Sequence, residues 1–106
     1  MKIFIPFTNL KAQTFAALPS GIFVPLLDKF YGYGEYFKQR WEEKETFINV
    51  EQDVVPRMDI LQEMWNCSEP ICVAGYCSSA DGASGISHIV CAKISKHLIL
   101  KSPGLF

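Results

Sequence analysis

An excess of charge of either sign is absent from this 106-residue sequence. The 10 Lys and Arg residues are balanced by 11 Asp and Glu residues, so the formal net charge is −1 at pH 7. Proteins that bind nucleic acid without sequence preference need a basic face, because contacts with phosphates supply most of that affinity. The charge balance therefore predicts no nucleic-acid partner.

Long apolar runs are absent as well. A membrane-spanning helix needs roughly 20 apolar residues in succession, and the apolar start MKIFIPF is interrupted by Thr8 and Asn9. A secretory signal peptide has a longer apolar region that ends in small residues. We therefore expect no membrane partner and a cytoplasmic protein.

The cysteine spacing of a common zinc site is also absent. The cysteines are Cys67, Cys72, Cys77 and Cys91, and none of them forms a C-x2-C pair. The simplest interpretation is small buried residues on strands. A Cys67–Cys72 disulfide and metal binding are the alternatives, although a reducing cytosol disfavours the disulfide.

The composition that remains is globular. Hydrophobic residues make up 49% of the chain and charged residues 20%, which is enough apolar side chain for one core and excludes a disordered protein. The length predicts one domain, 1–106. Aromatic residues are numerous for a small core, with eight Phe, four Tyr and two Trp, so we also expect a homo-oligomer that buries some of them.

Strand and helix patterns alternate along the chain. Apolar runs predict strands at 2–7, 22–27, 47–50, 71–76 and 86–91. Helical spacing predicts helices at 10–18, at 35–44 and from Pro56 onward, and the tail 93–100 is either helix or strand, with helix favoured. Residues 78–85 are small and polar, as in a loop or hairpin turn. This alternation predicts an α/β fold, a mainly parallel sheet of about five strands with helices on its faces.

Polar side chains follow three of these strands. Phe7 and Thr8 end the first strand, Asp28 follows the second, and Glu51 and Asp53 follow the third in the stretch FINVEQDVVP. Parallel strands bring their carboxyl ends to one edge of the sheet, which is where such sheets bind ligands. The sequence therefore predicts a ligand site at this edge.

The acidic pair at 51 and 53 has two interpretations. Two carboxylates one residue apart at a strand end can hold Mg2+ or Mn2+, which prefer oxygen ligands and often bridge phosphates. Acidic residues also precede helices because they favour the positive end of the helix dipole, and Pro56 indicates that a helix follows. Spacing alone does not separate a metal site from a capped turn.

The segment FINVEQDVVPRMDILQEMWNCSEPICVAGY resembles a group of glycosyltransferase-like proteins of bacteria and phages. Their pattern is a hydrophobic strand, E-x-D-V-x-P, a helix, two cysteines with four residues between them and a tyrosine. The corresponding residues here run from Glu51 to Pro56, followed by Cys67, Cys72 and Tyr76. KIFIPFTNLKAQTFAAL resembles the group's first strand and helix. GISHIVCAKIS resembles its segment in which a strand of small residues runs into a helix, so the resemblance covers most of the chain.

This resemblance implies a minimal GT-A-like nucleotide-binding sandwich that binds a nucleotide sugar with a divalent metal, Mn2+ or Mg2+. Asp53 would be a metal ligand and Glu51 its partner or a ribose contact, and both would be catalytic. Phe7 and Thr8 would lie near the base. The remaining implied contacts are a nucleotide contact from Asp28 and an acceptor contact from Tyr76.

Catalytic members of the group continue beyond the part that corresponds to this chain, so we expect a truncated form. Whether this form has enzymatic activity is left undecided by the sequence. The first hypothesis is a metal-dependent glycosyltransferase. An alternative is a phage protein that captures a nucleotide signal in the host cytoplasm without turnover, with the aromatic segment 30–33 on the base and Lys38 or Arg40 near phosphates. A structural protein that assembles with its own copies is the third hypothesis.

Overall fold

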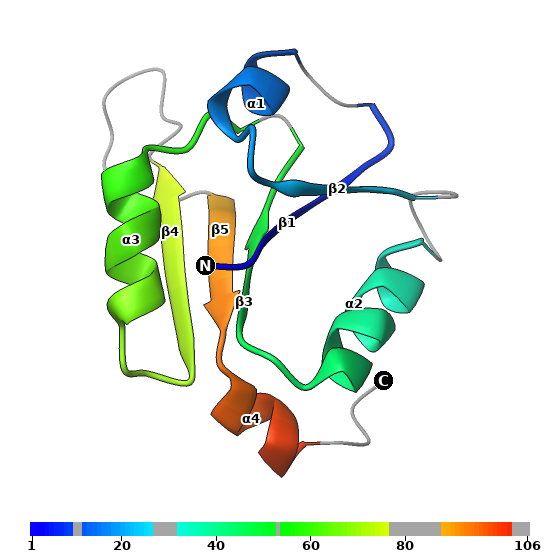
Figure 1. Ribbon diagram of the computed structural model, residues 1–106, viewed down its shortest axis with the longest axis vertical. Coiled ribbons are helices and arrows are strands. Elements are labelled where there is room, and N and C mark those ends of the chain that lie inside the picture. The colour runs from blue at the N-terminus through cyan, green and yellow to red at the C-terminus, as the bar shows by residue number, and fades with distance from the viewer. Residues whose placement is uncertain (10–11, 27–31, 53, 77–87, 103–106) are drawn as a thin grey trace.

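The computed structural model describes residues 1–9, 12–26, 32–52, 54–76 and 88–102. Within these ranges strands and helices alternate at first and two strands follow each other near the end (Figure 1). The elements are β1 Ile3–Phe7, α1 Ala12–Ala17, β2 Ile22–Pro25, α2 Gly32–Glu43, β3 Phe47–Val50, α3 Met58–Asn66, β4 Ile71–Tyr76, β5 His88–Ile94 and α4 Lys96–Lys101.

The strands form one mixed sheet in the order β2-β1-β3-β5-β4. β1 pairs in parallel with β2 and with β3, whereas β5 pairs antiparallel with β3 and with β4. The expected mainly parallel sheet is therefore wrong, and a GT-A-like sandwich is not shown. The cause is β5, which lies between β3 and β4 and runs in the opposite direction to both.

The face of the sheet that carries α3 is apolar. Alternate residues of the central strands point to this side and meet Leu61 and Met64 of α3. The buried members of this cluster are Ile3, Ile5, Leu18, Ile48, Val50, Leu61, Met64 and Cys91. Their burial is the main source of stability for this half of the core.

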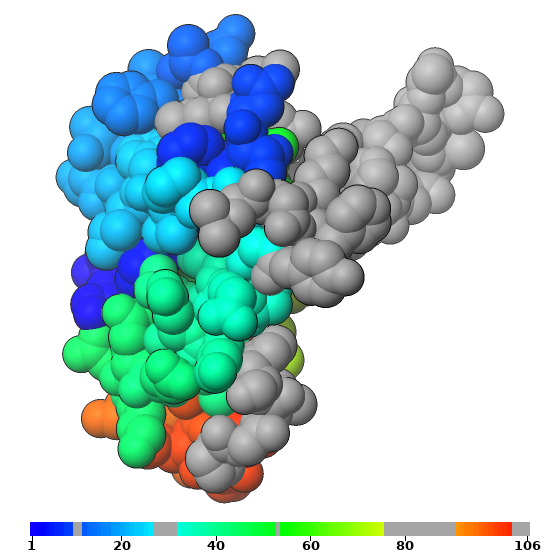
Figure 2. Space-filling model, turned by 90° about the vertical axis from the view of Figure 1, so that its right-hand side faces the viewer, coloured from blue at the N-terminus to red at the C-terminus, as the bar shows by residue number. Residues whose placement is uncertain are grey.

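The opposite face is covered by α2 and α4. Figure 2 views the molecule from this side and shows α2 across the middle, with α4 below it. The buried residues here are mostly aromatic, and the rings of Phe4 and Phe47 meet edge to face at 6.0 Å. The cluster consists of Phe4, Tyr36, Trp41, Phe47 and Ile99. Much of the aromatic content thus packs within the chain.

Several element boundaries differ from the sequence prediction, and two of them have a visible cause. The third helix begins at Met58 and not at Pro56, because Arg57 has an extended backbone with φ −84° and ψ 135°. β5 continues to Ile94, since its last residues pair with both β3 and β4. The chain then turns at Ser95, whose hydroxyl accepts a hydrogen bond from the Leu98 N–H and begins α4. The 78–85 turn lies outside the described residues.

None of the described helices is long and apolar enough to cross a membrane. The outer strand β4 differs from the central strands, because two of its apolar side chains face solvent. Ile71 is 51% exposed and Val73 is 54% exposed.

Candidate functional site

The carboxyl ends of β1, β2 and β3 meet at one edge of the sheet. β1 and β2 stay in register to the pair Phe7 and Pro25, and the Leu26 N–H donates to the Phe7 carbonyl at 2.8 Å. β3 runs in the same direction on the other side of β1. The prediction that these strand ends share an edge holds for the parallel half of the sheet.

Gln52 joins two of these strand ends. Its Oε1 atom accepts hydrogen bonds from the backbone N–H groups of Thr8 at 2.8 Å and Asn9 at 2.9 Å. Successive N–H groups that converge on one point form a concave site that favours an anionic oxygen. Gln52 Oε1 therefore occupies the position that a phosphate or carboxylate oxygen would take.

Glu51 lies beside this contact and on the face that α2 covers. Ile48 and Val50 point to the α3 face, so the alternation of the strand sends Asn49 and Glu51 to the other side. The half-buried Glu51 carboxylate accepts a hydrogen bond from the Tyr33 hydroxyl at 3.4 Å. The first turn of α2 thus helps to position this carboxylate.

Asn49 adds a polar group below Glu51 on the same face. It is only 8% exposed, and its Oδ1 atom has no hydrogen-bond partner among the described residues. A buried acceptor without a partner costs free energy, and native proteins rarely retain one without a reason. A ligand that donates a hydrogen bond here would satisfy it.

The other residues predicted for the site have different outcomes. Phe7 is half-buried and Thr8 is exposed, and both lie at the edge with Glu51. Tyr76 ends β4 at this same edge, because β4 runs in the direction of β3, although β5 separates the two strands. Asp28 and Asp53 lie outside the described residues.

A metal site is therefore described only in part. The described residues contain no group of three His, Cys, Asp or Glu side chains that could hold a metal ion. Glu51 fits a hard cation by the chemistry of its oxygen donors and by its place at a strand end. The second acid of the predicted pair is Asp53, so the described part supplies one of the two carboxylates.

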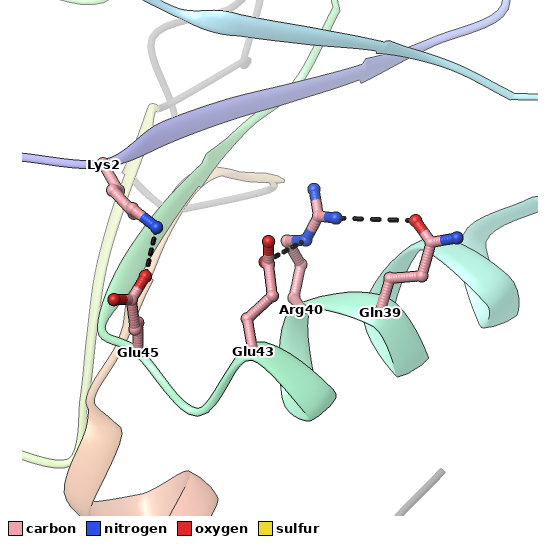
Figure 3. A network of polar contacts seen from close by, with 5 residues as sticks. All are labelled: Lys2, Gln39, Arg40, Glu43 and Glu45. Atoms are coloured by element: carbon pink, nitrogen blue, oxygen red, sulfur yellow. Dashed lines mark hydrogen bonds and ion pairs between the residues drawn. The ribbon is translucent and has the colours of Figure 1, made fainter.

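Arg40 packs against the core and not at this edge. Its guanidinium lies 4.1 Å from the centre of the Phe4 ring, and Nε is 2.8 Å from Glu43 Oε1. Figure 3 shows the contact of Arg40 with Glu43 and its hydrogen bond to Gln39, together with the ion pair of Lys2 and Glu45. Because Arg40 is 7% exposed and packed on the core, we leave it out of the candidate site.

The cysteines differ from the simplest prediction. Cys67 and Cys72 form a disulfide, so the interpretation of these two as buried free thiols is wrong. Cys91 is a buried free thiol, and burial, with a smaller contribution from the charge of Glu51, raises its pKa to about 11. Cys77 lies outside the described residues.

Sequence reasoning missed Gln52 and Asn49 as site residues. Asn49 carried a signal, since it is the one amide in the apolar strand FINV. Gln52 carried almost none, because its role depends on the loop that follows β1, more than 40 residues earlier in the chain. Tyr33 was named within the aromatic segment 30–33 as a contact for the base, whereas in the structure it lies in the first turn of α2 and donates to Glu51.

Comparisons of the chain with protein-family models, with curated proteins and with solved structures found no match.

Proposed function

We propose that this protein binds a nucleotide, in the form of a nucleoside diphosphate or a nucleotide sugar, at the edge formed by the carboxyl ends of β1, β2 and β3. The observation that carries the proposal is the convergence of the Thr8 and Asn9 N–H groups on a single oxygen beside the Glu51 carboxylate. Phosphate oxygens suit paired N–H donors, and ligands of such sheets bind beyond the strand ends.

In this proposal a phosphate oxygen of the ligand replaces Gln52 Oε1 on the two N–H groups. Displacing a neutral amide oxygen is favourable for an anion, because charge-assisted hydrogen bonds are stronger than neutral ones. Gln52 then protects the donors while no ligand is bound. Phe7, which is half-buried at the same edge, offers an apolar surface for the base.

A divalent cation would be held by Glu51 together with Asp53. When bound, such an ion neutralises the charge that develops on a departing diphosphate. Sugar transfer from the nucleotide is the activity that the resemblance adds, so we propose a metal-dependent glycosyltransferase. Capture of a nucleotide without turnover is an outcome of the test below.

The test is a thermal-shift and calorimetry panel of nucleoside diphosphates and nucleotide sugars, each with Mn2+ and with EDTA. A ligand that binds only the folded protein raises the melting temperature by mass action. We expect stabilisation by a nucleotide sugar with Mn2+ and slow release of free sugar. Stabilisation that persists in EDTA without product would support capture and contradict the transferase.

Two matched pairs of variants locate the binding site. Gln52→Glu places a carboxylate on the two N–H groups, so it should keep the fold and weaken nucleotide binding at least tenfold. Gln62→Glu makes the same change on an exposed position of α3 and should leave affinity unchanged. Glu51→Gln should remove the Mn2+ dependence, and Glu63→Gln should not. Equal affinity in Gln52→Glu and the wild type would overturn the proposed site.

A further inference from the structure

The Cys67–Cys72 disulfide links the end of α3 to the beginning of β4. Cys67 is the residue that follows the last turn of the helix, and Cys72 is the second residue of the strand. Both cysteines are half-buried, and Ser68 to Pro70, which connect Cys67 to β4, are exposed. The bridge therefore lies at the surface of the described structure.

Lys93 of β5 lies directly beside this disulfide. It is the register partner of Cys72 in the β4–β5 ladder, where side chains of opposed residues are neighbours. Its Nζ atom donates a hydrogen bond to the Cys67 carbonyl oxygen. Lys93 is thus bonded to one cysteine of the bridge and lies opposite the other in the ladder, although the two cysteines belong to different elements.

The lysine is buried, and the described residues supply no opposite charge to it. Lys93 is 6% exposed, and no carboxylate forms an ion pair with it in the part of the chain that the structure describes. A buried ammonium group without a partner costs free energy. The disulfide is neutral and supplies no counter-charge, whereas a cysteine thiolate would.

We propose that Cys67 and Cys72 form a reversible thiol–disulfide pair, and that Lys93 favours its reduced form by pairing with the Cys72 thiolate. Cys72 is the thiolate because it lies opposite Lys93. Cys67 follows the carboxyl end of α3, where the helix dipole disfavours a negative charge. A disulfide whose reduced form is stabilised in this way is a comparatively strong oxidant.

The reductant in this reaction is a dithiol. One of its thiolates attacks Cys67 Sγ, the S–S bond breaks, and the electron pair leaves with Cys72 Sγ as a thiolate beside Lys93. The second thiolate of the dithiol then attacks the sulfur atom of the same dithiol that is bonded to Cys67. The mixed disulfide breaks, and the released Cys67 thiolate takes up a proton. The products are the reduced protein and a cyclic disulfide, and two electrons have been transferred.

The other charged side chains on the described parts of the surrounding elements are exposed. They include Glu63 of α3, Glu69 of the connecting loop and Lys96, which follows Ser95, whose N–H donates to the Pro70 carbonyl. Solvent screens them, so the buried ammonium dominates. The simpler role for Lys93 is to cap the carbonyl end of α3, and that role predicts no effect on the thiols.

The first experiment measures the redox equilibrium. The folded protein is equilibrated with mixtures of reduced and oxidised dithiothreitol, and alkylation followed by mass spectrometry gives the oxidised fraction. Lys93→Met should shift the equilibrium at least tenfold toward the disulfide, about 30 mV by the two-electron relation. Lys93→Arg, which keeps the charge, and the exposed control Lys101→Met should stay near the wild type. An unchanged equilibrium in Lys93→Met would overturn the proposal.

The second experiment needs no variant. Alkylation rates of Cys72 in the reduced wild-type protein, followed from pH 5 to 10, should give a thiol pKa below the ordinary value of about 8.5. Buried Cys91 serves as a slow internal reference in the same samples. A midpoint for Cys72 at or above 8.5 would show that Lys93 only caps the helix, and the proposal would be wrong.

Discussion

The central strands and the outer strand β4 are stabilised in different ways. In β3 all the residues Phe47 to Val50 are buried, and helices cover both faces. In β4 the side chains of Ile71 and Val73 face solvent, and the strand is joined to α3 by a disulfide and to β5 by its ladder. Burial stabilises the centre of the sheet, whereas a covalent link and pairing stabilise its outer part.

The largest effect should come from emptying the centre. Ile48→Ala removes a fully buried side chain and should lower the free energy of unfolding by about 3 kcal/mol, from lost burial and the cavity left behind. Val73→Thr replaces an exposed side chain of β4 by one of similar shape. It should alter the free energy of unfolding by less than about 0.5 kcal/mol. Urea denaturation of both variants measures the difference.

Val73→Thr also tests the expected homo-oligomer. If the outer face of β4 is covered by a second copy, the substitution should cost more than about 1 kcal/mol. The melting temperature of the wild-type protein should then depend on protein concentration. A small, concentration-independent effect would confirm that this face of β4 is open to solvent.

A smaller effect should follow from removing the covalent link. The Cys67→Ser/Cys72→Ser double variant should lose about 2 kcal/mol, because the bridge closes a short loop in the unfolded chain. Chemical reduction of the wild type should cost less than this, since only the wild type can form the Cys72 thiolate beside Lys93. Equal losses in urea denaturation would count against a role for that ion pair.

The smallest effect should come from the exposed ion pair of Lys2 and Glu45. The hydrogen bond from Lys2 lowers the pKa of the Glu45 carboxyl from 4.5 in the folded protein. The folded state therefore binds fewer protons, so this contribution to stability is present above pH 4.5 and is lost as the pH falls through the lowered pKa. NMR titration of Glu45 should show its midpoint rising in Lys2→Met, and an unchanged midpoint would exclude the interaction.

Local patterns in the sequence predicted nearly all the strands and helices, both in the centre of the sheet and at β4. Apolar runs and helical spacing identified β1, β3, β4 and α2 within a few residues, because short-range periodicity reflects which face of an element is buried. The direction of β5 was missed, although a signal existed. Residues 77–87 between β4 and β5 are too few for a parallel crossover, which needs a dozen or more.

The candidate site was predictable only in outline. The strand ends that carry Phe7, Thr8 and Glu51 were recognisable because a polar residue follows each apolar run. The contact of Gln52 with the loop after β1 was not, since it joins segments far apart in the chain. Lys93 and Cys72 are likewise brought together by strand register alone.

The sequence by itself determined where strands and helices form, which side chains are apolar enough for a core, and which strands end in polar groups. These properties depend on residues within a few positions of one another. The tertiary structure decided that β5 inserts between β3 and β4, that Gln52 holds the Thr8 and Asn9 N–H groups, and that Lys93 lies against the disulfide. Those outcomes depend on pairing between distant segments, where register selects the neighbours of each side chain.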